Sequence, residues 1–138
     1  MGSETADAAG TATARPQSIS SNVLAAGTHV LALPTWIVGP LLVIWLSRSE
    51  YVTEHARHAI NWQLTVGVGY YLAGVLAVAT AAGGDSLFVL WASVLAVIVL
   101  GGNLLFCGVA AVRAARGCQW EYPVAIRLMT SADVSRTF

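Results

Sequence analysis

Charged side chains are scarce in this sequence of 138 residues. Asp, Glu, Lys and Arg make up 10% of it, whereas apolar residues make up 57%. A soluble domain carries about 25% charged residues, so the shortfall argues against a soluble protein. The charges are also segregated, because none occurs in residues 16–47, 58–84 or 86–112. Each of these runs is long enough to cross a bilayer as a helix, which takes about 20 apolar residues.

Lysine is absent, and every strong base is an arginine, which we ascribe to the base composition of the genome. The two cysteines, Cys107 and Cys118, are too few for a disulfide framework and have no zinc-site spacing. The sequence also lacks a Ser-His-Asp set, a glycine-rich phosphate loop and paired carboxylates in its apolar runs. We therefore predict no catalytic residue, no cofactor, no metal site and no nucleic-acid partner.

The charge-free runs predict an all-α, polytopic membrane protein with about three transmembrane helices. The expected spans cover residues 22–46, 60–82 and 87–115 of a membrane domain at 22–128. Residues 1–21 are expected to form a disordered tail, and residues 129–138 a C-terminal tail. A soluble helix bundle would need polar outer faces, which the stretch LFVLWASVLAVIVLGGNLLF does not have.

The first span contains Pro34, Gly39 and Pro40, and proline in a helix interior kinks or breaks the helix. A single kinked span is the preferred reading, and a re-entrant or two-piece segment is the second. Asp85 or Ser86 is expected to cap the start of the last span. Gly117 is placed to end that span as a C-cap.

Arginine distribution predicts the orientation, because cytoplasmic loops carry an excess of positive charge. With three spans, the loop at 47–59 and the C-terminal tail lie on one side. The N-terminal tail on the other side has only Arg15. We expect a protein of the cell membrane with its N-terminus outside and its C-terminus in the cytoplasm. The side predicted to be cytoplasmic carries Arg48, Arg57, Arg113, Arg116, Arg127 and Arg136.

The stretch HARHAINWQ, residues 55–63, crowds polar groups between two apolar runs. Helical spacing aligns some of them on one face, namely Glu54, Arg57, His58, Asn61 and Thr65. We expect a short interfacial helix at about 50–59 whose polar face meets the segment ARGCQWEYPVAIR. Along the helix, Glu54 could pair with Arg57 or with His58. Across to that segment, Glu121 is expected to pair with Arg57, and Glu54 with Arg113 or Arg116. Asn61 and Gln63 are expected to cap carbonyls of the kinked first span.

A second set of polar groups is expected inside the membrane. Asn103 is predicted to bond to Tyr70, Tyr71 or a carbonyl near Pro34, because a buried amide needs a partner. A structural clamp is preferred here over a substrate site. The second span also carries small residues every four positions, which predict close helix packing within the monomer or between copies. The polar set is His29, Thr35, Tyr70, Tyr71 and Asn103, and the small residues are Gly69, Ala73, Ala77 and Ala81.

Three motifs resemble the DUF4870 family of small membrane proteins. The first is GPLLVIWLSRS at the end of the first apolar run. The second is the pattern formed by His55, Ala59, Asn61, Trp62 and Gln63. The third follows the last span and consists of Ala114, Gly117, Trp120, Tyr122 and Pro123. The resemblance covers about Val23 to Leu128 and extends to a wider Tic20-like group, which includes chloroplast import components and magnetosome membrane proteins. It implies a compact helical membrane domain and supplies no activity.

These observations favour a non-enzymatic membrane protein that acts by association, with the bilayer and either further copies or another membrane protein as partners. One alternative is a small channel or carrier lined by His29, Thr35, Tyr70, Ser93 and Asn103. Another is a metal- or haem-binding membrane protein using His29, His55 and His58.

Overall fold

A computed structural model describes residues 18–83 and 86–129 of the chain. It contains four helices, α1 (Ile19–Thr35), α2 (Val38–Leu46), α3 (Glu50–Gly83) and α4 (Ser86–Ala115), and no strand within those residues. The prediction of an all-α protein is confirmed. Two helices, α3 over Glu50–Ala79 and α4 over Leu87–Ala115, are long and apolar enough to cross a membrane.

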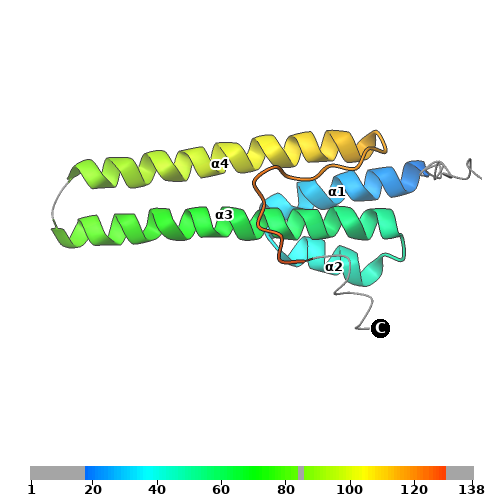
Figure 1. Ribbon diagram of the computed structural model, residues 1–138, viewed down its shortest axis with the longest axis horizontal. Coiled ribbons are helices and arrows are strands. Elements are labelled where there is room, and N and C mark those ends of the chain that lie inside the picture. The colour runs from blue at the N-terminus through cyan, green and yellow to red at the C-terminus, as the bar shows by residue number, and fades with distance from the viewer. Residues whose placement is uncertain (1–17, 84–85, 130–138) are drawn as a thin grey trace, which may run out of the picture.

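The long helices α3 and α4 form an antiparallel hairpin that sets the length of the molecule (Figure 1). Their contact depends on small residues. A Cβ atom on Gly69 would lie 2.8 Å from a methyl group of Val99, so the two helix backbones approach closely there. Ala73 on α3 and Ala92 on α4 are both buried farther along the hairpin. Part of the predicted stripe of small residues therefore serves packing within the monomer.

The first apolar run forms two helices that cover only one half of the long hairpin (Figure 1). Val43 of α2 packs against the cluster that contains Ala25 of α1 and Tyr51 of α3. The end of α2 thus lies beside the beginning of α1, and the two helices are antiparallel. The first run enters the bundle, turns and leaves it at the same end.

The turn between α1 and α2 has a defined chemical cause. Pro34 lies in the last turn of α1, and Trp36 follows with φ 55°, which is rare for a bulky residue. The indole Nε1 of Trp36 donates to the carbonyl oxygen of Gln63 at 2.9 Å, which holds this conformation against α3. Thr35 Oγ1 accepts from the backbone N–H of Gly39 at 3.1 Å and so serves as a cap for α2. Gly39 is required because a Cβ there would lie 2.7 Å from the Leu31 side chain.

Two expectations are corrected by this arrangement. The first run is a two-piece hairpin, which was the second reading, and not one kinked helix; two of the described helices are long and apolar enough to cross a membrane, and a third span is not confirmed. No separate interfacial helix occupies 50–59, because Glu50–Gly83 is one continuous helix. The outside N-terminus depended on three spans and stays a prediction; α1 begins beside the end of α4, with Asn22 next to Gly117. Residues 1–17, Asp85 and residues 130–138 lie outside the described part.

The segment after α4 turns back along the bundle and crosses to α3 (Figure 1). Gly117 has φ +75°, and its N–H donates to Ala114 while the N–H of Cys118 donates to Arg113. This is the Schellman form of helix ending, in which glycine is favoured because the left-handed conformation costs it nothing. The predicted C-cap at Gly117 is confirmed. The reversal carries Tyr122 into the bundle and Met129 to the side of α3.

Candidate functional site

A network of polar side chains fills the half of the bundle where all four helices meet. We call it the polar core and define it as His29, His55, Gln63, Asn103, Cys107 and Tyr122. All six are at most 7% exposed. Their side chains come from α1, α3, α4 and the segment after α4, so the network joins four parts of the chain.

His29 is the centre of the first half of the polar core. Its Nε2 lies 3.0 Å from Nδ1 of His55, and its Nδ1 lies 3.0 Å from the Tyr122 hydroxyl oxygen. A neutral imidazole carries one N–H, so His29 donates at one nitrogen and accepts at the other. Burial raises the pKa of Tyr122, so its hydroxyl stays protonated and can donate. The turn between α1 and α2 returns the first run along the bundle and leaves His29 in the polar core.

The second half of the polar core converges on Asn103. Its Oδ1 accepts from Trp62 Nε1 at 2.9 Å and from Gln63 Nε2 at 3.3 Å. The Cys107 thiol donates to the same oxygen at 3.4 Å. The predicted bond from Asn103 to Tyr70, Tyr71 or a carbonyl near Pro34 is wrong. The observed partners are Trp62 and Gln63 on the facing turn of α3, and Cys107 one turn along α4.

The two halves are joined through aromatic and sulfur contacts. The Tyr122 ring stacks on Trp62 with 4.9 Å between centroids and 3° between planes. Tyr122 also donates weakly to Cys107 Sγ at 3.9 Å. At the opposite end of the chain of bonds, His55 Nε2 is buried and has no partner within the described residues. The protons of this hydrogen-bonded chain can be ordered in either direction, because each imidazole can carry its N–H on either nitrogen.

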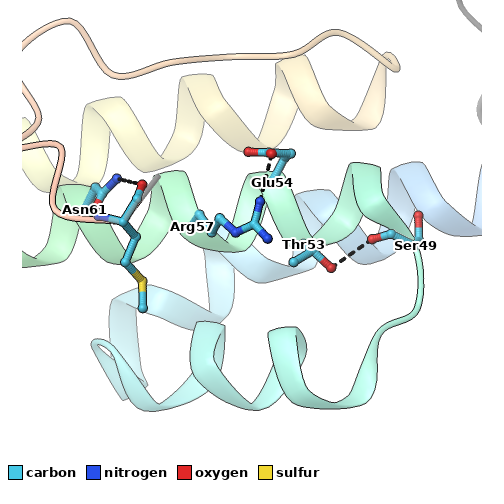
Figure 2. A network of polar contacts seen from close by, with 6 residues as sticks. Ser49, Thr53, Glu54, Arg57 and Asn61 are labelled. Carbon is cyan, nitrogen blue, oxygen red and sulfur yellow. Dashed lines mark hydrogen bonds and ion pairs between the residues drawn. The ribbon is translucent and has the colours of Figure 1, made fainter. Parts of the chain in front are cut away.

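A polar stripe on α3 binds the C-terminal segment, as the sequence predicts. Figure 2 shows Glu54, Arg57 and Asn61 following one another along this helix. Asn61 bonds to the backbone of Met129, and Thr65 Oγ1 accepts from the N–H of Ile126 at 2.9 Å. The hydroxyl of Thr53 donates to the carbonyl of Ser49, which directly precedes α3 (Figure 2).

The observed ion pairs match the expected ones only in part. Arg57 pairs with Glu54 at 2.8 Å, three residues earlier on the same helix, and not with Glu121. Glu121 pairs with Arg127 at 2.9 Å within the C-terminal segment. Gln63 was expected to cap the first run with its side chain, but its backbone carbonyl does so through Trp36. The pair of Glu54 with Arg57, which helical spacing allows, is therefore confirmed, whereas the longer-range pairs with the segment after α4 are not observed among the described residues.

The other residues singled out from the sequence differ in burial and in the pocket that they line. Ala59 is buried in α3, whereas Pro123 is exposed. Trp120 is half-buried, and the Arg113 guanidinium lies 4.9 Å above its ring. Tyr70 and Tyr71 are exposed and line a groove with Asn103, while His58 lines a different pocket together with Glu50 and Glu54. His58 is therefore separate from the pair formed by His29 and His55.

Two residues of the site were not predicted as members of it. Cys107 was considered for a disulfide or a zinc site, although its spacing of four from Asn103 places both on one face of α4. Nothing in the sequence indicated that Trp36 bonds to α3, except that it lies between Pro34 and Pro40. Within residues 18–83 and 86–129, no group of three or more His, Cys, Asp or Glu side chains is placed to hold a metal ion.

The comparison with known proteins supplies a family. No curated protein matches the chain, and neither does any solved structure. A family model matches residues 20–129, which include α1 to α4, the polar core and the stripe on α3. This stretch contains the motifs on which the sequence resemblance depends. The chain belongs to the magnetosome magnetite crystal formation protein family, MamF_MmsF.

Proposed function

We propose that this protein is an integral component of the magnetosome membrane that supports magnetite crystal formation by association with other membrane components, without catalysing a reaction. The single observation that carries the proposal is the distribution of polar groups. The polar core bonds mainly to itself and holds four segments together. The outer faces of the long helices are apolar, as shown by Val78, Val97 and Ile98, each more than 60% exposed.

The membrane position follows from helix lengths and arginines. At 1.5 Å per residue, α3 is about 51 Å long and α4 about 45 Å, both longer than the hydrocarbon core of about 30 Å. Asp85 is the single charged residue of the sequence near the α3–α4 turn, and the described arginines lie towards the opposite end. We assign the charged end to the cytoplasm by the positive-inside rule. Both ends of the described chain then lie on the cytoplasmic side. The arginines at this end are Arg48, Arg57, Arg113 and Arg116.

One face of α4 is suited to helix association. Gly101 and Gly108 are seven residues apart, and a Cβ on either would meet no atom within 4 Å. Leu105 lies between them and is 63% exposed. Small residues allow helix backbones to approach closely in lipid, where apolar burial gives no drive for association. We place the contact with a partner, or with a second copy, on this face.

A channel or carrier is not proposed, because α3 and α4 close upon each other beyond the polar core. Gly69 meets Val99, and Ala73 and Ala92 are buried in the same half. These contacts leave apolar walls between Asn103 and the far end of the hairpin. The Tic20-like resemblance enters this proposal as an analogy of fold alone.

Two experiments test the proposal. A photo-crosslinking amino acid at Leu105 is expected to capture a protein in magnetosome membranes, whereas the same group at Leu42 on α2 is expected to capture lipid. Leu42 is 50% exposed and provides the matched control. Capture of lipid alone at Leu105 would contradict association through this face.

The role in crystal formation is tested in a magnetosome-forming bacterium that lacks its own members of this family. Expression of the chain is expected to restore the size of the magnetite crystals seen by electron microscopy. A chain that reaches the magnetosome membrane and leaves the crystals unchanged would contradict the proposed role.

A further inference from the structure

A groove with a polar floor opens between the tip of the α1–α2 hairpin and the long helices. It has a volume of about 590 Å³, within the range of small-molecule sites. Trp36 forms one wall, Gly67 and Tyr70 of α3 form a second, and Leu100 and Leu104 of α4 form a third. Asn103 lies on the floor.

Asn103 carries hydrogen-bond donors that are not used inside the protein. Its side chain is 93% buried, since its exposed fraction is 7%. Its Oδ1 accepts from Trp62 and Gln63, which fixes the direction of the amide. Its Nδ2 makes no hydrogen bond to any residue that the structure describes, and it belongs to a residue that lines the groove. A donor without an acceptor is costly next to lipid, where water cannot replace the partner.

The walls of the groove present aromatic rings. The Trp36 indole is fixed by its bond to the Gln63 carbonyl and lies against Gly67, where a Cβ would be 2.8 Å from the ring. Tyr70 and Tyr71 line the same groove. Aromatic walls favour stacking with a flat ring, whereas an acyl chain needs only apolar contact. A second donor, the Tyr70 hydroxyl, comes from a different helix than Asn103.

The dimensions of the groove exclude a docked transmembrane helix. Its α3 wall extends from Gln63 to Tyr71 and its α4 wall from Leu100 to Leu104. At 1.5 Å per residue these walls are about 12 Å and about 6 Å long. A partner helix needs a face many turns long, whereas a small ring molecule fits within these lengths.

We propose that this groove binds a flat, carbonyl-bearing ring molecule dissolved in the bilayer, the chemical class to which quinones belong. The carbonyl oxygen accepts from Asn103 Nδ2, and the ring lies between Trp36 and Tyr70. The groove opens sideways to the lipid, so a molecule of this class reaches it without crossing an aqueous phase. The site is independent of the role in crystal formation, because its binding can be measured in purified protein.

The test uses a benzophenone probe with a decyl chain, which is itself an aromatic ketone and crosslinks on irradiation. Purified full-length protein in a maltoside detergent is labelled, and the labelled peptides are identified by mass spectrometry. Label is expected on the peptides that contain Trp36, Tyr70 and Leu104. Leu104→Trp fills the groove from a side chain that is half-exposed, and it is expected to reduce labelling at least fivefold. Leu90→Trp is the matched control, because Leu90 is similarly exposed on α4 and does not line this groove, and it is expected to label like the parent.

Competitors separate the carbonyl ring from other occupants. A decyl-substituted quinone is expected to compete at a concentration about fivefold lower than decylbenzene, which has the ring but no acceptor. Methyl decanoate, which has a carbonyl but no ring, is expected to compete weakly. Equal competition by decylbenzene would overturn the role of Asn103, and equal competition by methyl decanoate would assign the groove to lipid esters. Equal labelling of the two tryptophan variants would overturn the site.

Discussion

The side-chain amide of Asn61 holds the backbone of Met129 through both of its polar atoms. Nδ2 donates to the Met129 carbonyl oxygen at 3.1 Å, and Oδ1 accepts from the Met129 N–H at 3.0 Å. The two bonds have the donor and acceptor pattern of a β-ladder, but one side chain supplies both groups. A residue that lacks either the amide N–H or the carbonyl oxygen cannot make both bonds. It fastens the C-terminal segment to α3, 68 residues earlier in the chain.

Asn61→Ala is expected to release this segment. The variant loses two hydrogen bonds and leaves the Met129 backbone groups unpaired, at a cost of about 2 kcal/mol. Trypsin is then expected to cut after Arg127 faster than in the parent protein, followed by mass spectrometry. Thr53→Val is the control, because the Thr53 hydroxyl bonds to the Ser49 carbonyl just before α3 and not to the C-terminal segment. Equal cleavage rates in Asn61→Ala and the parent would show that the segment is held by other contacts.

The two ion pairs are expected to differ in their contribution to stability. The side chains of Arg57 and Glu54 are 10% and 21% exposed, whereas those of Arg127 and Glu121 are 70% and 51% exposed. Glu54→Gln leaves a largely buried guanidinium without its anion and is expected to destabilise by about 2 kcal/mol. Glu121→Gln is expected to cost about 0.5 kcal/mol or less, because water and salt screen an exposed pair.

Thermal melting in detergent, followed by circular dichroism, measures both variants. The difference between them is expected to persist at high salt, since the inner pair is poorly screened. Similar melting temperatures for the two variants would mean that Glu54 contributes no more than a surface charge.

Variants of the polar core are expected to lose stability in an order set by the hydrogen bonds that each one removes. His29→Leu removes two hydrogen bonds and strands the Tyr122 hydroxyl and Nδ1 of His55 in a buried site. Tyr122→Phe removes the bond to His29 but keeps the ring that stacks on Trp62. We expect His29→Leu to cost about 3 kcal/mol and Tyr122→Phe about 1 kcal/mol. The reverse order, measured by thermal melting, would show that His29 is not the centre of the network.

The long helices could be predicted from the sequence because composition and length decide them. The last span was expected at 87–115 and is α4, Ser86–Ala115. Gly117 was recognised as its cap because a left-handed residue at a helix end favours glycine. The contact between Asn61 and the C-terminal segment followed in outline from helical spacing, which places Asn61 and Thr65 on one face.

The re-entrant turn could not be chosen from the sequence because proline marks a break without giving its angle. A kinked span and a hairpin both accommodate Pro34 and Pro40. The choice depends on Trp36, whose indole reaches Gln63 from 27 residues away, and on Gly39, which lets α2 lie against Leu31. Such contacts are tertiary, and no local pattern reports them. Preferring one kinked span to a hairpin also placed the beginning and the end of the first run at opposite ends of the bundle.

Identical substitutions at two glycines test the packing of the long hairpin. A Cβ at Gly69 would lie 2.8 Å from Val99, so Gly69→Ala must push α3 and α4 apart and is expected to cost about 2 kcal/mol. A Cβ at Gly74 meets nothing within 4 Å, so Gly74→Ala is expected to stabilise by about 0.5–1 kcal/mol through helix propensity. Melting temperatures compare the two directly, and destabilisation of equal size at both sites would contradict the close approach at Gly69.

The re-entrant hairpin makes a prediction about topology that separates it from three spans. Both Ser20, next to the start of α1, and Cys118, after α4, are exposed at the charged end. In the double variant Ser20→Cys and Cys118→Ser, the new thiol is expected to react with a membrane-impermeant maleimide in inside-out vesicles and not in intact cells. Native Cys118 is expected to behave in the same way.

Leu87→Cys, at the opposite end of the hairpin and 60% exposed, is expected to react only from outside. Cys107 is buried and serves as an internal blank in the Cys118→Ser protein. A kinked first span would carry position 20 to the outer surface, so that it reacts in intact cells together with position 87. Labelling of positions 20 and 118 from one side is therefore compatible only with an even number of crossings, because α3 and α4 supply two and the α1–α2 hairpin returns to the side from which it enters.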